Sequence, residues 1–433
     1  MPLSALLPDL SRVLDAREAR WAERERLAAE GTVLSATVRA PHALRLANPE
    51  LLAEADDAIR AAGFVPVSVR FTADGPEALY RTEKDARAAK KAVIALEDGL
   101  AFGRFLDLDV TAKGGGAVSR RDLRFPERRC LVCGRSAWEC IRSKAHGPDE
   151  AGEALEAARR PETADPAWRI ARAAGLAAQE ELRLLVKPGL VTPLSRGSHE
   201  DMDFALMLKA LGSLEGWWRE CAAAGLAAGA ATPALLEALR PRGIEAEKEM
   251  MRATGGVNAY RGLIYLLGIL CAAAGACGKE GAEAVFAAAA AMCAGEASRP
   301  TGTDTRAKRR GFDFPGARGE AASGFPSVRA ALGLFEEERA AGTARPDAAA
   351  DALLLLISRT DDSNVAGRGG LEGLFWIKEE ARRVLGLGGL ASEAGTRAYS
   401  DFCRKTEAKR LSPGGSADLL ACALFISRLK NID

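Results

Sequence analysis

The segment GSHEDMDF, residues 197–204, gathers residue types that bind metals and move protons. His199, one of three histidines in the chain, stands beside three carboxylates just before an apolar run. Such charges are costly to bury unless they are paired, protonated or bound to a cation. If Ser198 caps the following helix, supported by Asp201 three residues later, the acids are merely solvated. If the segment lines a cleft, His199 and Asp203, which would share a helical face, indicate a metal or general-base site.

Two later loops combine acids, arginine and glycine, and a basic run at residues 306–310 precedes one of them. The loops contain Asp361, Asp362, Arg368, Gly369 and Gly370, and further upstream Arg318 and Glu320. Glycines let backbone N–H groups converge on an anion, and arginine offers a fork of donors. Mg²⁺ takes few carboxylates and shares phosphate oxygens. We therefore expect a nucleoside triphosphate with Mg²⁺, with Asp203 and Asp361 as candidate ligands of the cation.

The segment RFLDLDV places a second acidic pair near the N-terminus. Asp107 and Asp109 would share one face of a strand, because side chains alternate with period two. The plain alternative is a solvent-facing edge strand. Arg104 upstream and Lys113, followed by three glycines, favour a Mg²⁺–phosphate site with Asp107 and Asp109 as the metal ligands.

A cysteine-rich segment follows this strand, and its four candidate zinc ligands are Cys130, Cys133, Cys140 and His146. The spacing Cys-x2-Cys-x6-Cys-x5-His supplies the residue types of a zinc site. It lacks the usual second close pair, so buried or incidental thiols are the alternative interpretation.

Composition restricts the class of protein. The 60 basic and 59 acidic residues give a net charge of +1, so no global field attracts nucleic acid or an acidic membrane. Nine scattered cysteines suit reduced thiols in a cytosol. The N-terminus becomes charged too early for a signal peptide, and the apolar run at 263–277 is shorter than the ~20 residues of a spanning helix. We expect a cytoplasmic protein without nucleic-acid or membrane partners.

Strand and helix signals divide the chain into two parts. The first part has a charged amphipathic helix at residues 11–30 and β-branched or alternating runs at 32–40, 64–73 and 104–110. Beyond a polar segment interrupted by prolines, long Ala/Leu-rich helical segments alternate with Gly-rich loops. We expect an α+β domain over residues 1–148, a linker over 149–166 and a larger all-α domain over 167–433.

Five motifs in the second part resemble the triphosphoribosyl-dephospho-CoA synthases, in the same order. They are GLVTPLSRGSHEDMDF, TGGVNAYRG, GARGEAASGFPSV, DSNVAGRGGLEGL and PGGSADLLA. The resemblance implies that the 2′-hydroxyl of 3′-dephospho-CoA attacks the ribose C1′ of ATP and expels adenine. The catalytic candidates are His199, Asp201, Asp203, Glu320, Asp361 and Asp362. The substrate-binding candidates are Asn258, Arg261, Arg318, Arg368, Gly369 and Gly370.

The second part departs from its family pattern at two places. The family usually reads Asn-Thr-His-Lys-Gly where this chain has Asn258-Ala259-Tyr260-Arg261-Gly262. It often has a histidine at the position of Gly367. With these histidines absent, His199 and the acids carry more of the expected proton chemistry.

The first part resembles the phosphoribosyl-dephospho-CoA transferases of citrate lyase, in VLDAREARWAERERL, GRFLDLDV and RRCLVCGRSAWECIRSKAH. The resemblance implies a nucleotidyltransferase-like mixed sheet with helices. It also implies transfer of the prosthetic group to a serine of the acyl carrier protein (the γ subunit) of citrate lyase, with release of diphosphate. Asp107 and Asp109 are the catalytic candidates, and Arg104 and Lys113 the phosphate-binding candidates.

The two resemblances are consecutive steps of one pathway, so a bifunctional transferase is the leading interpretation. One alternative keeps this chemistry but serves the malonate decarboxylase carrier protein. Another is a non-catalytic zinc-binding module fused to a helical scaffold.

Overall fold

The structure is a computed structural model, and it describes residues 10–159, 165–278, 280–296, 311–312 and 314–430. The basic run expected at 306–310 lies outside these residues. The chain forms two compact units that divide within residues 160–164. The expected fold class, α+β followed by all-α, is confirmed.

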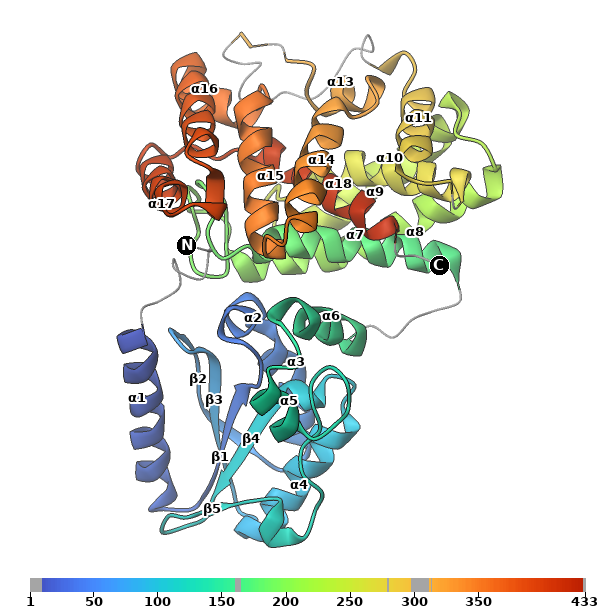
Figure 1. The fold of residues 1–433 in the computed structure, drawn as a ribbon. Helices are drawn as coiled ribbons and strands as arrows, with labels where there is room; N and C mark the ends of the chain where they lie inside the picture. Colours follow the sequence, from blue (N-terminus) through green and yellow to red (C-terminus); the bar gives the residue numbers. More distant parts are fainter. Residues whose placement is uncertain (1–9, 160–164, 279, 297–310, 313, 431–433) are drawn as a thin grey trace. The chain divides into compact units, whose positions relative to one another are not determined.

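The N-terminal unit is built on one five-stranded sheet (Figure 1). Its order is β2-β3-β1-β4-β5, with β1 at Thr32–Val38, β2 at Val65–Thr72, β3 at Gly75–Thr82, β4 at Leu106–Thr111 and β5 at Ala117–Val118. All of its pairings are antiparallel, so the mixed sheet expected from the resemblance is in fact antiparallel.

Helices cover both faces of this sheet. They are α1 (Leu10–Ala28), α2 (His42–Ala47), α3 (Glu50–Ala61), α4 (Ala86–Gly99), α5 (Ala137–Ser143) and α6 (Pro148–Arg159). The alternation of strand side chains sends Leu34 and Leu108 into a core with α3 and α4, while Val33 packs on Leu27 of α1. Figure 1 shows α1 on one side of the sheet and α3 and α4 on the other.

Helix α6 occupies most of the segment expected to be a linker. Its Leu155 is 1 % exposed and belongs to the sheet core. An alanine-rich, amphipathic helix of 12 residues has a stable position only when its apolar stripe is covered. The helix is therefore part of the N-terminal unit.

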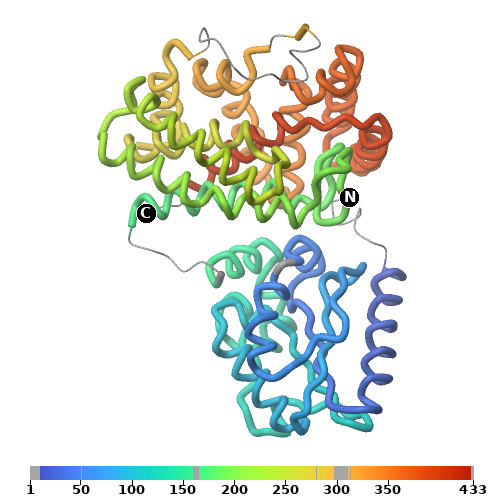
Figure 2. The backbone as a smooth tube through the Cα atoms, turned by 180° about the vertical axis from the view of Figure 1, so that it is seen from behind, coloured from blue at the N-terminus to red at the C-terminus, as the bar shows by residue number. Residues whose placement is uncertain are grey.

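The C-terminal unit is a bundle of helices around one core (Figures 1 and 2). They are α7 (Pro166–Arg183), α8 (Phe204–Ala228), α9 (Pro233–Ala253), α10 (Arg261–Cys277), α11 (Ala282–Met292), α13 (Gly316–Ala322), α14 (Pro326–Ala340), α15 (Arg345–Arg359), α16 (Ser363–Gly386), α17 (Glu393–Ala408) and α18 (Gly414–Leu429). Helices α8 and α10 approach closely, since a Cβ on Gly225 would lie 2.0 Å from the Ala272 carbonyl oxygen.

Within the described residues, no single helix combines the length and hydropathy that crossing a membrane requires. Helices α10 and α11 pass that test only as a pair, by length and composition, with a bend of 115° between them.

Candidate functional sites

A cavity of about 280 Å³ lies in the C-terminal unit, where the loop before α8 meets the starts of α10, α16 and α18. Its polar lining is mostly contributed by residues at helix ends and in the loops between them. These residues are Glu181, Lys187, His199, Asp201, Asn258, Tyr260, Ser363, Asn364, Arg368, Ser412 and Asp418. The cavity thus brings together four predicted site residues, His199, Asp201, Asn258 and Arg368. We call it the helical-unit pocket.

His199 is held as a neutral ring in this pocket. An arginine has no acceptor, so the contact of 3.1 Å from Arg368 Nη2 makes His199 Nδ1 the acceptor. The proton then sits on Nε2, which donates to Ser412 Oγ at 2.8 Å. Burial and the Arg368 charge lower the pKa of His199 to about 4, although Asp201 opposes the shift. His199 is therefore a weak base at neutral pH and orients Arg368 and Ser412.

The strongest candidate base of the helical-unit pocket is Asp418, near the start of α18. Its carboxylate has no hydrogen bond or ion pair among the described residues. Burial, followed by the charges of Glu181 and Asp362, raises its pKa well above the usual value. Glu181 itself is bound to Lys187 Nζ at 2.6 Å. Burial raises the pKa of Glu181 and lowers that of Lys187, because both lose hydration.

Two polar groups on the loop before α10 face the same pocket. Asn258 Oδ1 accepts from the backbone N–H of Arg261 at 3.3 Å. Tyr260 is 4 % exposed, and its hydroxyl has no hydrogen-bond partner among the described residues. A buried hydroxyl without a partner is costly, so it is available for a substrate atom.

The cap of α8 differs from the sequence expectation. Helix α8 begins at Phe204, and Asp203 caps it by accepting from Leu206 N at 3.0 Å. Ser198 instead donates to the Leu411 carbonyl at 2.5 Å. His199 and Asp203 both precede the helix, so the expected shared helical face is wrong. Asp203 also pairs with Arg196 at 3.0 Å and does not line the pocket.

The acids at the start of α16 have separate partners. Asp361 is 54 % exposed and pairs with Lys378 Nζ at 2.7 Å. Asp362 caps α16 through Asn364 N and also accepts from Ser416 N at 3.0 Å, which ties α16 to α18. Neither acid lines the pocket, so the structure does not bring Asp203 and Asp361 together there.

The remaining candidates of this unit also lie outside the pocket lining. Glu320 caps α14 by accepting from Ser327 N at 2.8 Å. Arg261 pairs with Glu247, and Arg318 lies on α13. Gly369 and Gly370 lie within α16, where a Cβ on Gly369 would clash with Leu411. The glycines therefore serve helix packing and a kink, and of the five candidates at 361–370 only Arg368 lines the pocket, beside Ser363 and Asn364.

The N-terminal unit has a larger cavity, of about 710 Å³, which we call the basic cavity. Five arginines line it: Arg39, Arg104, Arg120, Arg128 and Arg129. Glu97 of α4 is 5 % exposed and holds two of them, with contacts of 2.8 Å to Arg120 and 2.7 Å to Arg128. Burial, followed by the Arg128 charge, lowers the pKa of Arg39. Such crowded cations suit a polyphosphate.

Asp107 and Asp109 project from the same side of β4, opposite Thr37 and Ser35 of β1. Arg128 joins them to the basic cavity, because it contacts both Asp107 and Glu97. Burial and the Asp107 charge raise the pKa of Asp109.

The predicted phosphate ligands lie at opposite ends of β4. Arg104 precedes the strand and lines the basic cavity, whereas Lys113 follows it in the β4–β5 turn. A strand of 6 residues separates them by on the order of 20 Å. Lys113 therefore does not serve the same phosphate as Arg104.

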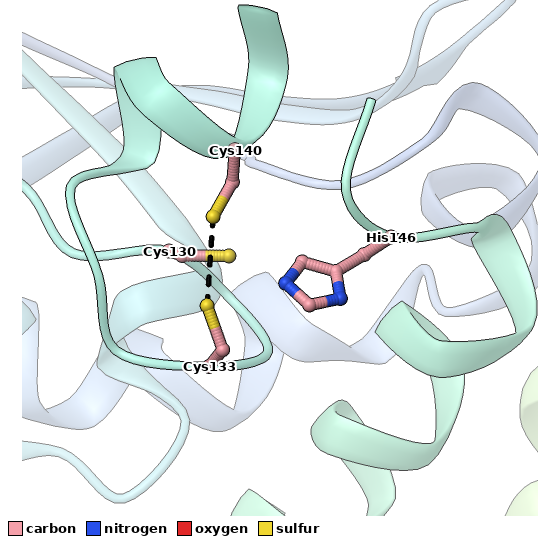
Figure 3. Close-up of side chains that lie close together, drawn as sticks. All are labelled: Cys130, Cys133, Cys140 and His146. Atoms are coloured by element: carbon pink, nitrogen blue, oxygen red, sulfur yellow. Dashed lines mark hydrogen bonds between the residues drawn. The ribbon is translucent and has the colours of Figure 1, made fainter. Parts of the chain in front are cut away.

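The four predicted zinc ligands, Cys130, Cys133, Cys140 and His146, converge in the same unit (Figure 3). Their ligand atoms all lie within 4.8 Å of one another, and we call them the Cys3His cluster. Arg135 Nε donates to the Cys133 thiol and lowers its pKa to about 5. Burial raises the pKa of the Cys140 thiol to about 11. The cluster is a candidate metal site.

Sequence reasoning missed several residues of both sites. They are Glu181, Lys187, Tyr260, Asn364, Ser412 and Asp418 in the helical-unit pocket, and Arg39, Arg120, Arg128, Arg129 and Glu97 at the basic cavity. Asp418 and Ser412 flank the PGGS segment, and Arg128-Arg129 precede Cys130, so those motifs carried a signal. Glu181 and Glu97 lie in the last turns of α7 and α4, without any local signal.

Comparison with known proteins covers both units. Residues 167–433 match the family described as ATP:dephospho-CoA triphosphoribosyl transferase, and residues 8–159 match Apo-citrate lyase phosphoribosyl-dephospho-CoA transferase. The Protein CitXG of Haemophilus influenzae is 32% identical over 377 residues, which are 82% of this chain and 80% of the relative. The 2-(5''-triphosphoribosyl)-3'-dephosphocoenzyme-A synthase of Klebsiella pneumoniae is 39% identical over 265 residues, 60% of this chain and 94% of the relative. The chain therefore belongs to the family in which these two transferases are fused, and it is a bifunctional transferase of citrate lyase prosthetic-group biosynthesis.

Proposed function

We propose that the helical-unit pocket binds ATP and 3′-dephospho-CoA and forms the glycosidic bond between them. The 2′-hydroxyl oxygen of dephospho-CoA bonds to C1′ of the ATP ribose, while the C1′–N9 bond breaks and adenine leaves. The hydroxyl proton goes to Asp418, and adenine takes up a proton from solvent. Carboxylates stabilise the oxocarbenium-like transition state, and Arg368 binds phosphate. The supporting observation is that Asp418 has no partner among the described residues and lines a pocket that also presents Arg368.

The basic cavity is the proposed site of the second reaction. A serine hydroxyl of the citrate lyase acyl carrier protein bonds to the α-phosphorus of the triphosphoribosyl group, and the bond to the outgoing diphosphate breaks. Arg39, Arg104 and Arg128 hold the phosphates. Asp109, which lies outside the cavity lining on the same side of β4 as Asp107, accepts the serine proton. This assignment rests on five arginines around a cavity that Arg128 links to Asp107.

Mg²⁺ is the cofactor proposed for this second site. Two carboxylates on one side of β4, with Asp109 52 % exposed, fit a cation that shares its shell with phosphate oxygens. When bound, Mg²⁺ would neutralise charge on the transferred group and on the diphosphate. Arg128 would then turn from Asp107 towards phosphate. The Cys3His cluster has no step in either reaction, because three thiol ligands suit softer metals than Mg²⁺.

The test follows the two products separately. Incubation with ATP, Mg²⁺ and dephospho-CoA should release adenine only when dephospho-CoA is present. Adding the citrate lyase carrier protein should then raise its mass by the phosphoribosyl-dephospho-CoA group. A competition assay with the citrate lyase and malonate decarboxylase carrier proteins together identifies the partner as the one that is modified faster. Adenine release that ignores dephospho-CoA contradicts the first assignment.

A further inference from the structure

The Cys3His cluster has the dimensions of a tetrahedral metal site. Cys133 Sγ and Cys140 Sγ are 3.5 Å apart, and no ligand atom of the cluster is more than 4.8 Å from another. Zinc–sulfur bonds of about 2.3 Å give a tetrahedron with edges of about 3.8 Å. Figure 3 shows the three sulfurs and the imidazole directed towards a common centre. A single ion fits that centre.

His146 is oriented as a metal ligand. Its Nδ1 lies 3.2 Å from Glu150 Oε1, and Glu150 is itself held by the Gly147 N–H at 2.8 Å. Its Nε2 is buried and has no hydrogen-bond partner among the residues described. Figure 3 shows this nitrogen on the side of the sulfurs. A carboxylate that holds one ring nitrogen while the other faces the ion is the usual arrangement around zinc.

The local backbone supports bound thiolates. The turn that carries Cys130 and Cys133 is closed by Cys130 N donating to the Arg135 carbonyl at 2.7 Å. Gly134 has a φ of 72°, which favours glycine directly after the second cysteine. Val132 N lies 3.4 Å from Cys130 Sγ and donates to it. The ligands come from this turn, from α5 and from the segment just before α6, so one ion would join three segments.

A disulfide explains less of this arrangement. It would use Cys133 and Cys140 and leave Cys130 and the unpartnered His146 Nε2 without a role. Four convergent donors from separate segments are what a closed structural zinc site requires. All four positions are filled by the protein, so no open position remains for catalysis.

We propose that the Cys3His cluster binds one Zn²⁺ ion in a closed site, and that this ion fixes the segment carrying Arg128 and Arg129 at the basic cavity. Arg128 stands two residues before Cys130 and spans Asp107 and Glu97. Arg129 forms a bridge with Ser136, and its carbonyl accepts from Arg39 at 3.1 Å. Without the ion, the turn loses its link to α5 and α6. The ion would thus hold Arg128 and Arg129 in place at the basic cavity. This positioning role rests on the proposed transfer reaction.

Metal content of the full chain tests the site directly. When the protein is purified without added metal or chelator, it should contain about one zinc ion per chain. Native mass spectrometry and inductively coupled plasma mass spectrometry measure this content. Cys133→Ser and His146→Ala should lose it, and Glu150→Gln should weaken zinc affinity by about 10–100-fold. The control Cys277→Ser, a thiol of α10 outside the cluster, should keep it. A zinc-free wild type with fully alkylated thiols, or with a Cys133–Cys140 disulfide, overturns the site even if the variants fail to fold.

Zinc removal from the wild type tests the positioning role. After chelation and return to excess Mg²⁺, carrier-protein modification should fall at least about 10-fold while adenine release is unchanged. Adding Zn²⁺ back to this Mg²⁺-containing protein should restore carrier-protein modification. Zinc-free protein that still modifies the carrier at the original rate overturns the positioning role. A zinc-loaded protein that never modifies the carrier contradicts the proposed transfer reaction instead.

Discussion

The basic cavity and the helical-unit pocket present opposite chemistry. Five arginines line the first, and its buried Glu97 is fully engaged by two of them. The second presents Arg368 among the carboxylates of Glu181, Asp201 and Asp418, and it is smaller, at about 280 Å³ against about 710 Å³. The basic cavity therefore concentrates positive charge, whereas carboxylates outnumber cations in the lining of the helical-unit pocket even with Lys187 counted.

On the proposed assignment of the two reactions, the difference follows from where charge develops in each. Glycosyl transfer builds positive charge at the ribose, which nearby carboxylates stabilise. Phosphoryl transfer gathers negative charge on oxygens, which arginines and a cation stabilise. On that assignment, the triphosphate of the first product would be repelled by the acids of the helical-unit pocket and attracted by the arginines of the basic cavity.

Among the variants that test this difference between the sites, Asp418→Asn should have the largest effect on activity. Loss of a placed charge at the transition state costs on the order of 3 kcal/mol, so adenine release should fall about 100-fold or more. Stability should not fall. The raised pKa means that the folded chain holds this proton more tightly than the unfolded chain, so ionisation at neutral pH costs stability that Asn recovers.

Asp361→Asn is the matched control, because Asp361 is 54 % exposed and lies outside the pocket lining. Adenine release should stay within about twofold, since exposed substitutions have small effects. Assays of both variants, with thermal melts at pH 7, decide the assignment. Equal loss of adenine release in both variants would contradict the assignment of the base to Asp418 and support the predicted role of Asp361.

Arg128→Ala should affect only the other site. Charged hydrogen bonds contribute about 1.5–3 kcal/mol each, so carrier-protein modification should fall about 10–100-fold while adenine release continues. Arg60→Ala is the control, because the ion pair of Arg60 in the described part of the chain lies within α3, with Asp56. The measurement is carrier mass after incubation with preformed triphosphoribosyl-dephospho-CoA. Parallel loss of both activities would show that Arg128 supports the fold rather than the phosphates.

Local patterns predicted much of the fold. Strand signals at 32–40, 64–73 and 104–110 correspond to β1, β2 and β4, and the Ala/Leu-rich segments of the second part form helices. The prediction missed β3, whose sequence GPEALYRT lacks alternation because seven of its eight residues are buried. Helix α17 was also missed, because its sequence is rich in charged and polar residues.

Local patterns predicted the sites less well, because long-range packing decides which way an acid faces. Asp203, Glu320 and Asp362 lie in motifs, yet each accepts the free N–H groups at a helix start. Asp418 and Glu181 meet only through packing of α18 on α7. The Cys3His cluster was predictable because its ligands lie within 17 residues of sequence, so local turns bring them together.

Acidification should weaken the helical unit through His199. Its pKa falls to about 4 in the folded chain, below its usual 6.5, so the unfolded chain takes up a proton first. Stability present above pH 6.5 is lost as the pH falls, by about 1–2 kcal/mol at pH 5. His199→Gln should lose less between pH 7.5 and 5, measured by denaturant unfolding. An identical pH slope in both proteins would mean that His199 is not held neutral.

Tyr260→Phe should have the smallest effect, and it tests whether the Tyr260 hydroxyl contacts substrate in the helical-unit pocket. The Tyr260 hydroxyl is buried without a partner among the described residues, so its removal should leave stability unchanged or raise it by up to about 1 kcal/mol. If the hydroxyl bonds a substrate, KM should rise about fivefold, which corresponds to about 1 kcal/mol.

Tyr399→Phe is the matched control. Tyr399 Oη donates to the Val186 carbonyl at 2.9 Å, and Tyr399 does not line the pocket. That variant should lose about 1 kcal/mol of stability and keep its KM, so the two substitutions should separate binding from folding. An unchanged KM in Tyr260→Phe would leave substrate recognition on that side of the pocket to Asn258.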